Sequence, residues 1–219
     1  SETTEYFASQ PAYTLHKQVR KKFKRRRIYV KSINDLYQLD LCDMQSLAKY
    51  NNGYKYILVC IDCFSKFVHA EALKTKNSAE VVAAFERILS NNNAPVFVQT
   101  DKGSEFLGHP FQQLLQKYDI KFYTSENPDI KASIAERVIR TLKTKIWRYF
   151  SYKSTFNWVD VLEKIVQSYN SSYHRSIKMA PREVTPENEA KVRITLFPEN
   201  KPTKYKFKFR IGDHVRISI

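Results

Sequence analysis

Long apolar runs are absent from this chain of 219 residues. No run reaches the roughly 18 apolar residues of a transmembrane helix. The opening stretch, SETTEYFASQPAYTLHKQ, lacks the apolar core of a signal peptide. Internal repeats and low-complexity tracts are missing as well. These absences argue against a membrane-spanning helix, and the content of 42% hydrophobic and 14% aromatic residues predicts a globular chain.

Cysteine is scarce, and the three that are present, Cys42, Cys60 and Cys63, lie inside apolar segments. An odd number without the spacing of a disulfide framework favours reduced, buried thiols in an intracellular protein. Cys60 and Cys63 have zinc-like spacing, but no second Cys or His pair follows them. His16 has no cysteine partners nearby, so a His-His-Cys-Cys module either precedes this sequence or is lacking.

Acidic residues are too few to balance the basic ones. The 37 Lys and Arg against 22 Asp and Glu give a net charge of +15, with a pI near 9.6. Such an excess points to a polyanion, most often nucleic acid, although a structural chromatin or ribosomal-type protein would show it too. Eight of the eleven residues 17–27 are Lys or Arg. This basic stretch is expected to be a solvated tail or a nuclear-import signal, an arm that grips DNA phosphates, or both. Its expected DNA contacts are Lys21, Lys22, Lys24, Arg25, Arg26 and Arg27.

The chain does contain a clear succession of strand and helix patterns. The strand patterns are YQLDLCDM, YKYILVCID, KFVHAEAL, APVFVQT and IKFYT. The first three follow one another as a meander, and the last two alternate with helices expected at 77–89, 106–118, 133–150 and 157–173. This order predicts an α/β fold, a mixed five-stranded sheet flanked by helices as in the RNase H-like architecture.

Four parts are expected along the chain. Residues 1–34 form a basic arm without regular structure, and residues 35–185 form the core. Residues 186–204 are rich in proline and charge and are expected to form a linker. Residues 205–219 have the pattern of the opening strands of a small β-barrel, which is incomplete at Ile219.

Three acids fall on three different predicted elements: Asp40 inside the first strand, Asp101 at the end of the fourth, and Glu136 at a helix start. Phosphodiester chemistry commonly uses two divalent cations held by converging carboxylates. Asp40 is the least expected of the three, because an acid between Leu39 and Leu41 costs desolvation energy unless it is paired or bound to metal. The weaker candidates are Asp43, on the opposite side of its strand, Asp62, in a turn, and Glu105, in a loop.

Each of the three acids also has a simpler interpretation. Asp40 would form an ion pair with an arginine, and Asp101 would accept hydrogen bonds in its own turn. Glu136 would complete a capping box with Ser133 as the N-cap. From the residues alone, both interpretations stay open.

Four segments, YQLDL, YILVCIDCFSKF, VQTDKGSEF and NPDIKASIAERVIRTLK, resemble the retroviral-type integrase core of the DDE recombinase superfamily. The resemblance covers about residues 35–185, and DMQ, NNGYKYIL and the last motif resemble most closely the integrases of Polinton/Maverick DNA transposons. It implies that Asp40, Asp101 and Glu136 are catalytic and hold two Mg²⁺ or Mn²⁺ ions. Residues 102–135 separate the last two acids, one fewer than in the retroviral pattern, and Ser133 stands where many members have Gly. The segment IGDHVRIS resembles the start of the family's SH3-like barrel.

The resemblance therefore implies a DNA integrase that processes the 3′ ends of a transposon and joins them to target DNA. Its expected partners are double-stranded DNA, both element ends and target, and further copies of itself on that DNA; neither a membrane nor a small-molecule cofactor is expected. The expected location is the nucleus. Expected DNA contacts around the acids are Lys102, Lys131, Arg137, Arg140 and Lys143. The alternatives are a domesticated integrase that only binds nucleic acid and an RNase H-like nuclease.

Overall fold

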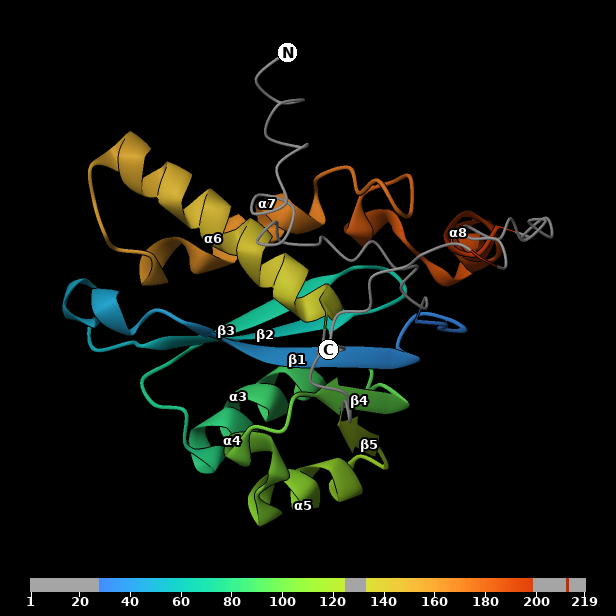
Figure 1. The fold of residues 1–219 in the computed structure, drawn as a ribbon, viewed down its shortest axis with the longest axis horizontal. Helices are drawn as coiled ribbons and strands as arrows, with labels where there is room; N and C mark the ends of the chain where they lie inside the picture. The colour runs from blue at the N-terminus through green and yellow to red at the C-terminus, as the bar shows by residue number, and fades with distance from the viewer. Residues whose placement is uncertain (1–27, 125–132, 199–211, 213–219) are drawn as a thin grey trace.

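The computed structural model describes residues 28–124, 133–198 and 212. A five-stranded sheet runs through the middle, with helices on both faces (Figure 1). All five predicted strands are present, in the order β3-β2-β1-β4-β5 across the sheet. Their bounds are β1 Leu36–Asp43, β2 Tyr56–Asp62, β3 Val68–Leu73, β4 Phe97–Thr100 and β5 Lys121–Thr124.

The sheet is mixed, as the predicted order of elements requires. The meander β1-β2-β3 is antiparallel, whereas β4 pairs with β1, and β5 with β4, in parallel. Strand β2 is buried along almost its whole length, which explains its nearly unbroken apolar sequence. In the register of β1 with β4, Gln38 lies opposite Gln99. Strands β1 and β4 therefore run side by side toward Asp40 and Asp101.

Two apolar layers hold the helices against the sheet. One face carries α3 Ser78–Ser90, α4 Ser104–Leu107 and α5 His109–Lys117, and its core includes Tyr37 and Leu39 from β1. The other face carries α6 Ser133–Lys153 and α7 Leu162–Asn170, and its core includes Cys42 from β1 and the apolar stripe of α6. Figure 1 shows α6 crossing above the sheet and α3, α4 and α5 below it. Successive residues of β1 thus point into different layers.

Several local predictions are confirmed. Asn77 caps α3, because its Oδ1 accepts a hydrogen bond from the Glu80 amide at 2.9 Å. The three cysteines are free and buried. Burial raises the pKa of Cys63 to about 12, so its thiol stays protonated at neutral pH.

The helices differ from the expected ranges in two places. The helix expected over 106–118 is broken into α4 and α5 at Gly108, which ends one helix and begins the next. Pro110 occupies the first turn of α5, where its missing N–H costs no hydrogen bond. The helix expected over 157–173 consists of the 3₁₀ turn η2 Val159–Val161 followed by the shorter α7.

The stretch after Pro181, expected to form a linker from 186 to 204, contains regular structure up to Leu196. It forms the 3₁₀ turns η3 Pro181–Glu183 and η4 Pro186–Asn188, followed by the helix α8 Glu189–Leu196. A further 3₁₀ turn, η1 Gln45–Tyr50, follows β1. Val192 is fully buried against Val30, Phe64 and Ile177. The Glu189 carboxylate accepts from the Ile33 amide at 2.9 Å. The content of proline and charge predicted a linker, but a few apolar side chains are enough to anchor a short helix.

The predicted N-terminal arm and the predicted barrel lie almost wholly outside the described residues. Of the arm, only residues 28–34 are described, and Val30 among them is buried in the same apolar group as Val192. Of the barrel segment, only residue 212 is described. No helix in the described ranges has the length and apolar character needed to cross a membrane.

Candidate active site

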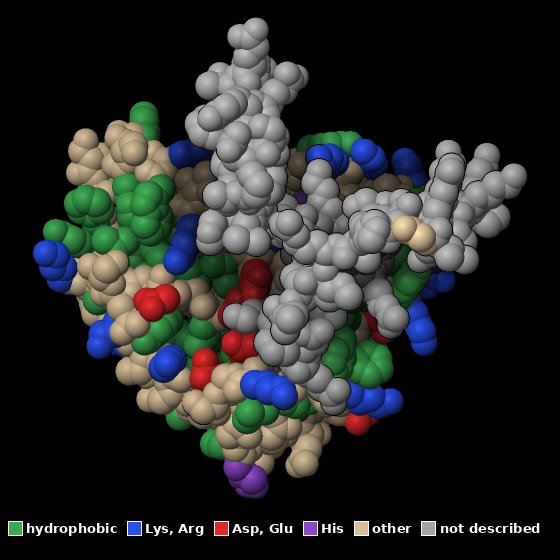
Figure 2. Space-filling model, in the orientation of Figure 1, with side chains coloured by type: hydrophobic (Ala, Val, Ile, Leu, Met, Phe, Trp, Pro, Cys, Tyr) green, Lys and Arg blue, Asp and Glu red, His purple; other side chains and the backbone are tan. Residues whose placement is uncertain are grey.

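The three acids lie on β1, just after β4 and in the first turn of α6. Asp40 is partly buried within β1, and Asp101 follows the last residue of β4. Glu136 is the fourth residue of α6 and is also partly buried. Figure 2 shows several acidic side chains near the centre of one face, with Lys and Arg side chains around them.

Gln38 connects these three elements directly. Its Nε2 donates to Gln99 Oε1 on β4 at 2.8 Å. Its Oε1 accepts from the amides of Ile134 and Ala135, at 3.0 and 3.1 Å, in the first turn of α6. Gln38 is fully buried, so these bonds are shielded from water and costly to lose.

This network lies next to all three acids. Asp40 follows Gln38 by two residues on the same side of β1, and Asp101 follows Gln99 by two. Glu136 directly follows Ala135. Gln38 therefore fixes the start of α6 relative to the strands that carry Asp40 and Asp101.

The Gln38 bonds cap α6 in a way that the capping-box interpretation of Ser133 and Glu136 does not include. Ser133 is the first residue of α6, and Gln38 on the sheet accepts from the exposed amides of the helix's first turn. A sequence pattern within one helix cannot reveal such a cap, because the acceptor comes from a residue almost a hundred positions earlier.

The carboxylates themselves make local hydrogen bonds. Asp40 Oδ1 accepts from the Leu41 amide at 2.8 Å. Asp101 Oδ1 accepts from the Gly103 amide at 3.1 Å, which is the turn geometry expected of its simpler interpretation. Within the described ranges, no three His, Cys, Asp or Glu side chains lie close enough together to hold a metal ion. The donor set, three carboxylates from three elements, has the chemistry that hard divalent cations prefer.

Asp62 has a structural role, as its place in a turn predicts. Asp62 is 2% exposed, and its carboxylate accepts from the Phe64 amide at 3.0 Å and from the Ser65 hydroxyl at 2.6 Å. Burial raises the pKa of Asp62, and these hydrogen bonds oppose that rise. Its oxygens are occupied in holding the β2–β3 turn.

Three of the cations expected to contact DNA, Arg137, Arg140 and Lys143, lie on α6, and they line two different hollows. Arg140 and Lys143 line the same hollow as Glu136, whereas Arg137 lines a cavity with Lys66 and Arg175. Lys143 also influences Cys42 on β1. Burial raises the pKa of Cys42 to about 11; the charge of Lys143 opposes this rise, and that of Asp40 adds to it. Lys102 is exposed beside Asp101. Lys131 and the six arm residues Lys21, Lys22, Lys24, Arg25, Arg26 and Arg27 lie outside the described residues.

Gln38, Gln99, Lys66 and Arg175 did not stand out in the sequence. For the two glutamines a signal existed: each is a polar residue two positions before a candidate acid, in an otherwise apolar strand. Lys66 and Arg175 lie in loops far apart in sequence, and only the fold brings them together.

The mixed five-stranded sheet, its strand order and the helices on both faces define an RNase H-like core. Residues 31–128 match the model of the integrase core domain family. The chain is 34% identical over 176 residues to a transposon-derived protein of Caenorhabditis elegans, covering 80% of this chain and 59% of that protein. It is 26% identical over 174 residues to the human KRAB-A domain-containing protein 2, covering 78% of this chain and 35% of that protein.

Solved structures agree on the fold. The catalytic core domain of HTLV-2 integrase, solved with magnesium, matches with a TM-score of 0.60 and 22% identity, over 71% of this chain and 99% of that one. The simian T-cell lymphotropic virus intasome, solved with a PP2A regulatory subunit, matches with a TM-score of 0.67 and 21% identity, over 94% of this chain and 72% of that one. The chain thus has the fold of a retroviral integrase core, its residues 31–128 match the integrase core domain, and it spans little more than half of the length of the worm relative.

Proposed function

We propose that this protein is a DNA integrase that processes the 3′ ends of a transposable element and joins them to target DNA. The observation that carries the proposal is the Gln38 network, which ties β1, β4 and the start of α6 together beside Asp40, Asp101 and Glu136. A network of this kind gives three acids a fixed relation, which catalysis by positioning requires.

In the first step, water displaces the terminal nucleotides near the 3′ end and leaves a free 3′ hydroxyl. In the second, that hydroxyl attacks a phosphodiester of target DNA, and the new bond forms as the old P–O bond breaks. Neither step needs a covalent enzyme intermediate. Asp40, Asp101 and Glu136 would hold divalent cations, Mg²⁺ or Mn²⁺, which when bound supply Lewis-acid stabilisation of charge at phosphorus.

The remaining work falls to the protein's own side chains. Arg140 and Lys143 share the hollow of Glu136, so a DNA backbone lying there would meet cations on α6. Lys102 is exposed beside Asp101 and would contact the same strand. We also propose that the protein assembles as a homo-multimer on DNA and works in the nucleus, in keeping with its net charge of +15.

The test is a strand-transfer assay with element-end DNA and Mg²⁺ or Mn²⁺, using the wild-type chain and the variants D40N and D101N. The proposal expects joined products from the wild type and none from either variant, with DNA binding retained by all three. Binding without joining in the wild type would support the second candidate, a domesticated integrase that only binds nucleic acid. The transposon-derived relative motivates that candidate. Cleavage of RNA–DNA hybrids without joining would support an RNase H-like nuclease instead.

A further inference from the structure

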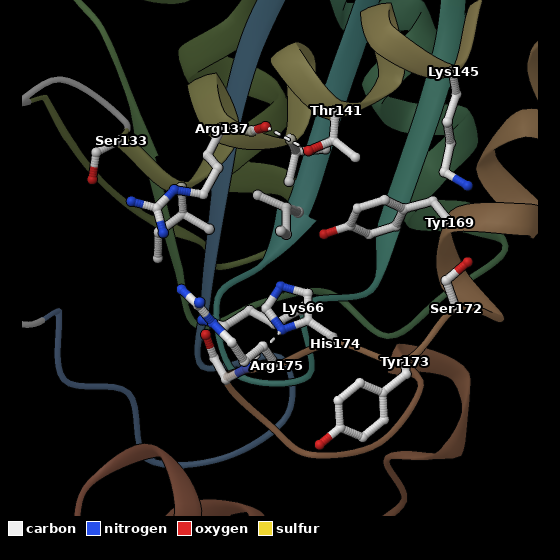
Figure 3. Close-up of a pocket in the computed structure, with 14 residues that line it drawn as sticks. Lys66, Ser133, Arg137, Thr141, Lys145, Tyr169, Ser172, Tyr173, His174 and Arg175 are labelled. Atoms are coloured by element: carbon white, nitrogen blue, oxygen red, sulfur yellow. Dashed lines mark hydrogen bonds between the residues drawn. The ribbon is translucent and has the colours of Figure 1, made fainter. Parts of the chain in front are cut away.

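A basic cavity of about 340 Å³ lies beside α6, lined by different residues from the hollow of Glu136. Its charged and titratable lining residues are Lys66, Arg137, Lys145, His174 and Arg175. Figure 3 shows Lys66, Arg137, His174 and Arg175 together at one end of the cavity, and Tyr169 and Tyr173 at the other. No Asp or Glu is among the described residues that line it. We call it the Lys66 cavity.

Within the part of the chain that the structure describes, no ion pair neutralises the positive charge of the cavity. Among the described residues, the salt bridges join Arg87 to Glu71 and Lys117 to Glu86, and neither involves a cation of this cavity. Burial lowers the pKa of Lys66, and the nearby charge of Arg137 adds to that effect, against the opposing influence of Cys63 and Asp62. The cations therefore lie close enough together to repel one another.

Lys66 is an unfavourable place for a lysine on two further counts. Its side chain is almost entirely buried, with the whole residue 9% exposed, and its Nζ donates to the Cys63 carbonyl. Its backbone has φ of 64°, in the left-handed region that glycine adopts at no steric cost. Three features are thus unfavourable: the burial of the charge, the strained backbone and the neighbouring cations. A bound anion would offset the first and the third.

The hydrogen-bond donors of the cavity suit a phosphate group. The Lys66 ammonium has two further N–H groups after its bond to Cys63, and the guanidinium groups of Arg137 and Arg175 offer forked donors. His174 Nδ1 accepts from the Ser176 amide at 3.3 Å, so a neutral His174 carries its proton on Nε2 as another donor. Several converging donors, with no carboxylate among the described lining residues, suit a tetrahedral dianion or a phosphodiester.

A second hollow, of about 610 Å³, shares Lys66, Arg137 and Arg175 with this cavity and adds Lys178. The cations thus extend beyond a single ion-sized site. We propose that the Lys66 cavity binds phosphate groups through Lys66, Arg137, Arg175 and His174. Two sources have this chemistry: a backbone phosphate of DNA, which rests on the proposed function, and a free phosphate or polyphosphate.

The first experiment measures binding of inorganic phosphate, without DNA or divalent metal, so its result is independent of any joining activity. The melting temperature is followed as phosphate is added, against sodium chloride at equal ionic strength. The variants are Lys66→Gly, which removes the ammonium and the backbone strain, and Arg175→Gln. The control is Lys164→Gln, an exposed cation on α7 outside this cavity.

The wild type and Lys164→Gln should be stabilised by phosphate beyond the chloride control. In Lys66→Gly and Arg175→Gln the phosphate concentration for half-maximal stabilisation should rise at least tenfold. Without phosphate, Lys66→Gly should melt at the wild-type temperature or above it. Equal phosphate responses in all four proteins would overturn the proposal. If Lys66→Gly does not fold, Arg175→Gln, exposed on a loop, still decides the outcome.

The second experiment distinguishes the sources by the affinity of a short DNA duplex as a function of salt. Loss of one phosphate contact should reduce the log–log slope by about 1. A reduced slope in Arg175→Gln, unlike Lys164→Gln, identifies a DNA phosphate as the ligand. An unchanged slope together with a lost phosphate response identifies a free phosphate. An unchanged slope with an unchanged phosphate response overturns the proposal.

Discussion

The side chain of Gln38 on β1 donates to that of Gln99 on β4 at 2.8 Å, and both side chains are buried. The bond joins two residues that already lie opposite each other in the sheet. Because Gln38 Oε1 also caps α6, a single side chain specifies the register of two strands and the position of a helix. The three candidate acids are positioned by a polar contact in the core.

The two glutamines make different numbers of bonds, and this predicts unequal effects. Gln38→Leu leaves Gln99 Oε1 without its donor and the N–H groups of Ile134 and Ala135 without their acceptor, so it should cost about 2 to 3 kcal/mol of unfolding free energy. Gln99→Leu orphans only one donor and should cost about 1 kcal/mol. Urea unfolding measures both. Equal costs would contradict the asymmetric role given to Gln38.

Many of the strands and helices could be predicted from the sequence, because their apolar residues recur at the spacing of a strand or a helix. Strand β2, with nearly every residue buried, and the stripe Val138, Leu142, Ile146 of α6 were recognisable from spacing alone. The placement of Asp62 in a turn also followed, since Asp bonds its own local backbone.

The rest depends on contacts between distant segments. The Gln38 cap joins residues almost a hundred positions apart, and the Lys66 cavity gathers the β2–β3 turn, α6 and the loop after α7. No local pattern encodes either. Helix α8 was missed for a related reason: it is anchored by the burial of Val192 against residues such as Val30 from the other end of the chain, not by a strong pattern of its own.

Asp62 should prove structural and not catalytic. Asp62→Asn keeps the size of the side chain but turns one acceptor into a donor facing the Ser65 amide and hydroxyl. We expect a loss of about 1 to 3 kcal/mol in unfolding free energy, with strand transfer falling only in proportion to the folded fraction. Asp40→Asn should show the reverse, near-normal melting without joining. Loss of joining in a fully folded Asp62→Asn protein would disprove the structural assignment.

Acid should destabilise the protein through two partly buried histidines, His69 and His174. Burial lowers the pKa of His69 to about 4, and burial with the charges of Lys66, Arg137 and Arg175 lowers that of His174 to about 4. In the unfolded chain these histidines have their ordinary pKa of 6.5, so between pH 4 and 6.5 the unfolded chain binds more protons than the folded chain. The stability that depends on these neutral histidines is therefore fully present above pH 6.5 and is lost as the pH falls toward 4.

His69→Phe tests the first of these histidines. The ring packs beside Phe67, with centroids 5.0 Å apart, so phenylalanine should fit there. Unfolding free energies at pH 7, 5.5 and 4.5 should fall less steeply in His69→Phe than in the wild type. The difference between the two proteins isolates His69 from Asp62, whose raised pKa gives the opposite pH dependence. Parallel curves would refute the prediction; His109→Gln, at an exposed position, is the matched control.

The sharpest test of the active site is Glu136→Gln. The amides of Ile134 and Ala135 are already capped by Gln38, so the start of α6 does not depend on the Glu136 carboxylate. Melting should therefore change little. DNA binding should stay equal or become tighter, because one negative charge leaves the hollow of Arg140 and Lys143.

Strand transfer, in contrast, should fall by more than about 100-fold, the scale observed when one group that stabilises a transition state is removed. The matched control is Glu105→Gln, which neutralises a partly buried acid in the first turn of α4, close to Asp101 in sequence. Joining should survive that change, since Glu105 is not among the three acids beside the Gln38 network. If Glu136→Gln joins DNA nearly as well as the wild type, Glu136 is not a metal ligand, and the assignment of all three acids fails with it. If Glu105→Gln alone abolishes joining, the third carboxylate is on α4 and not on α6.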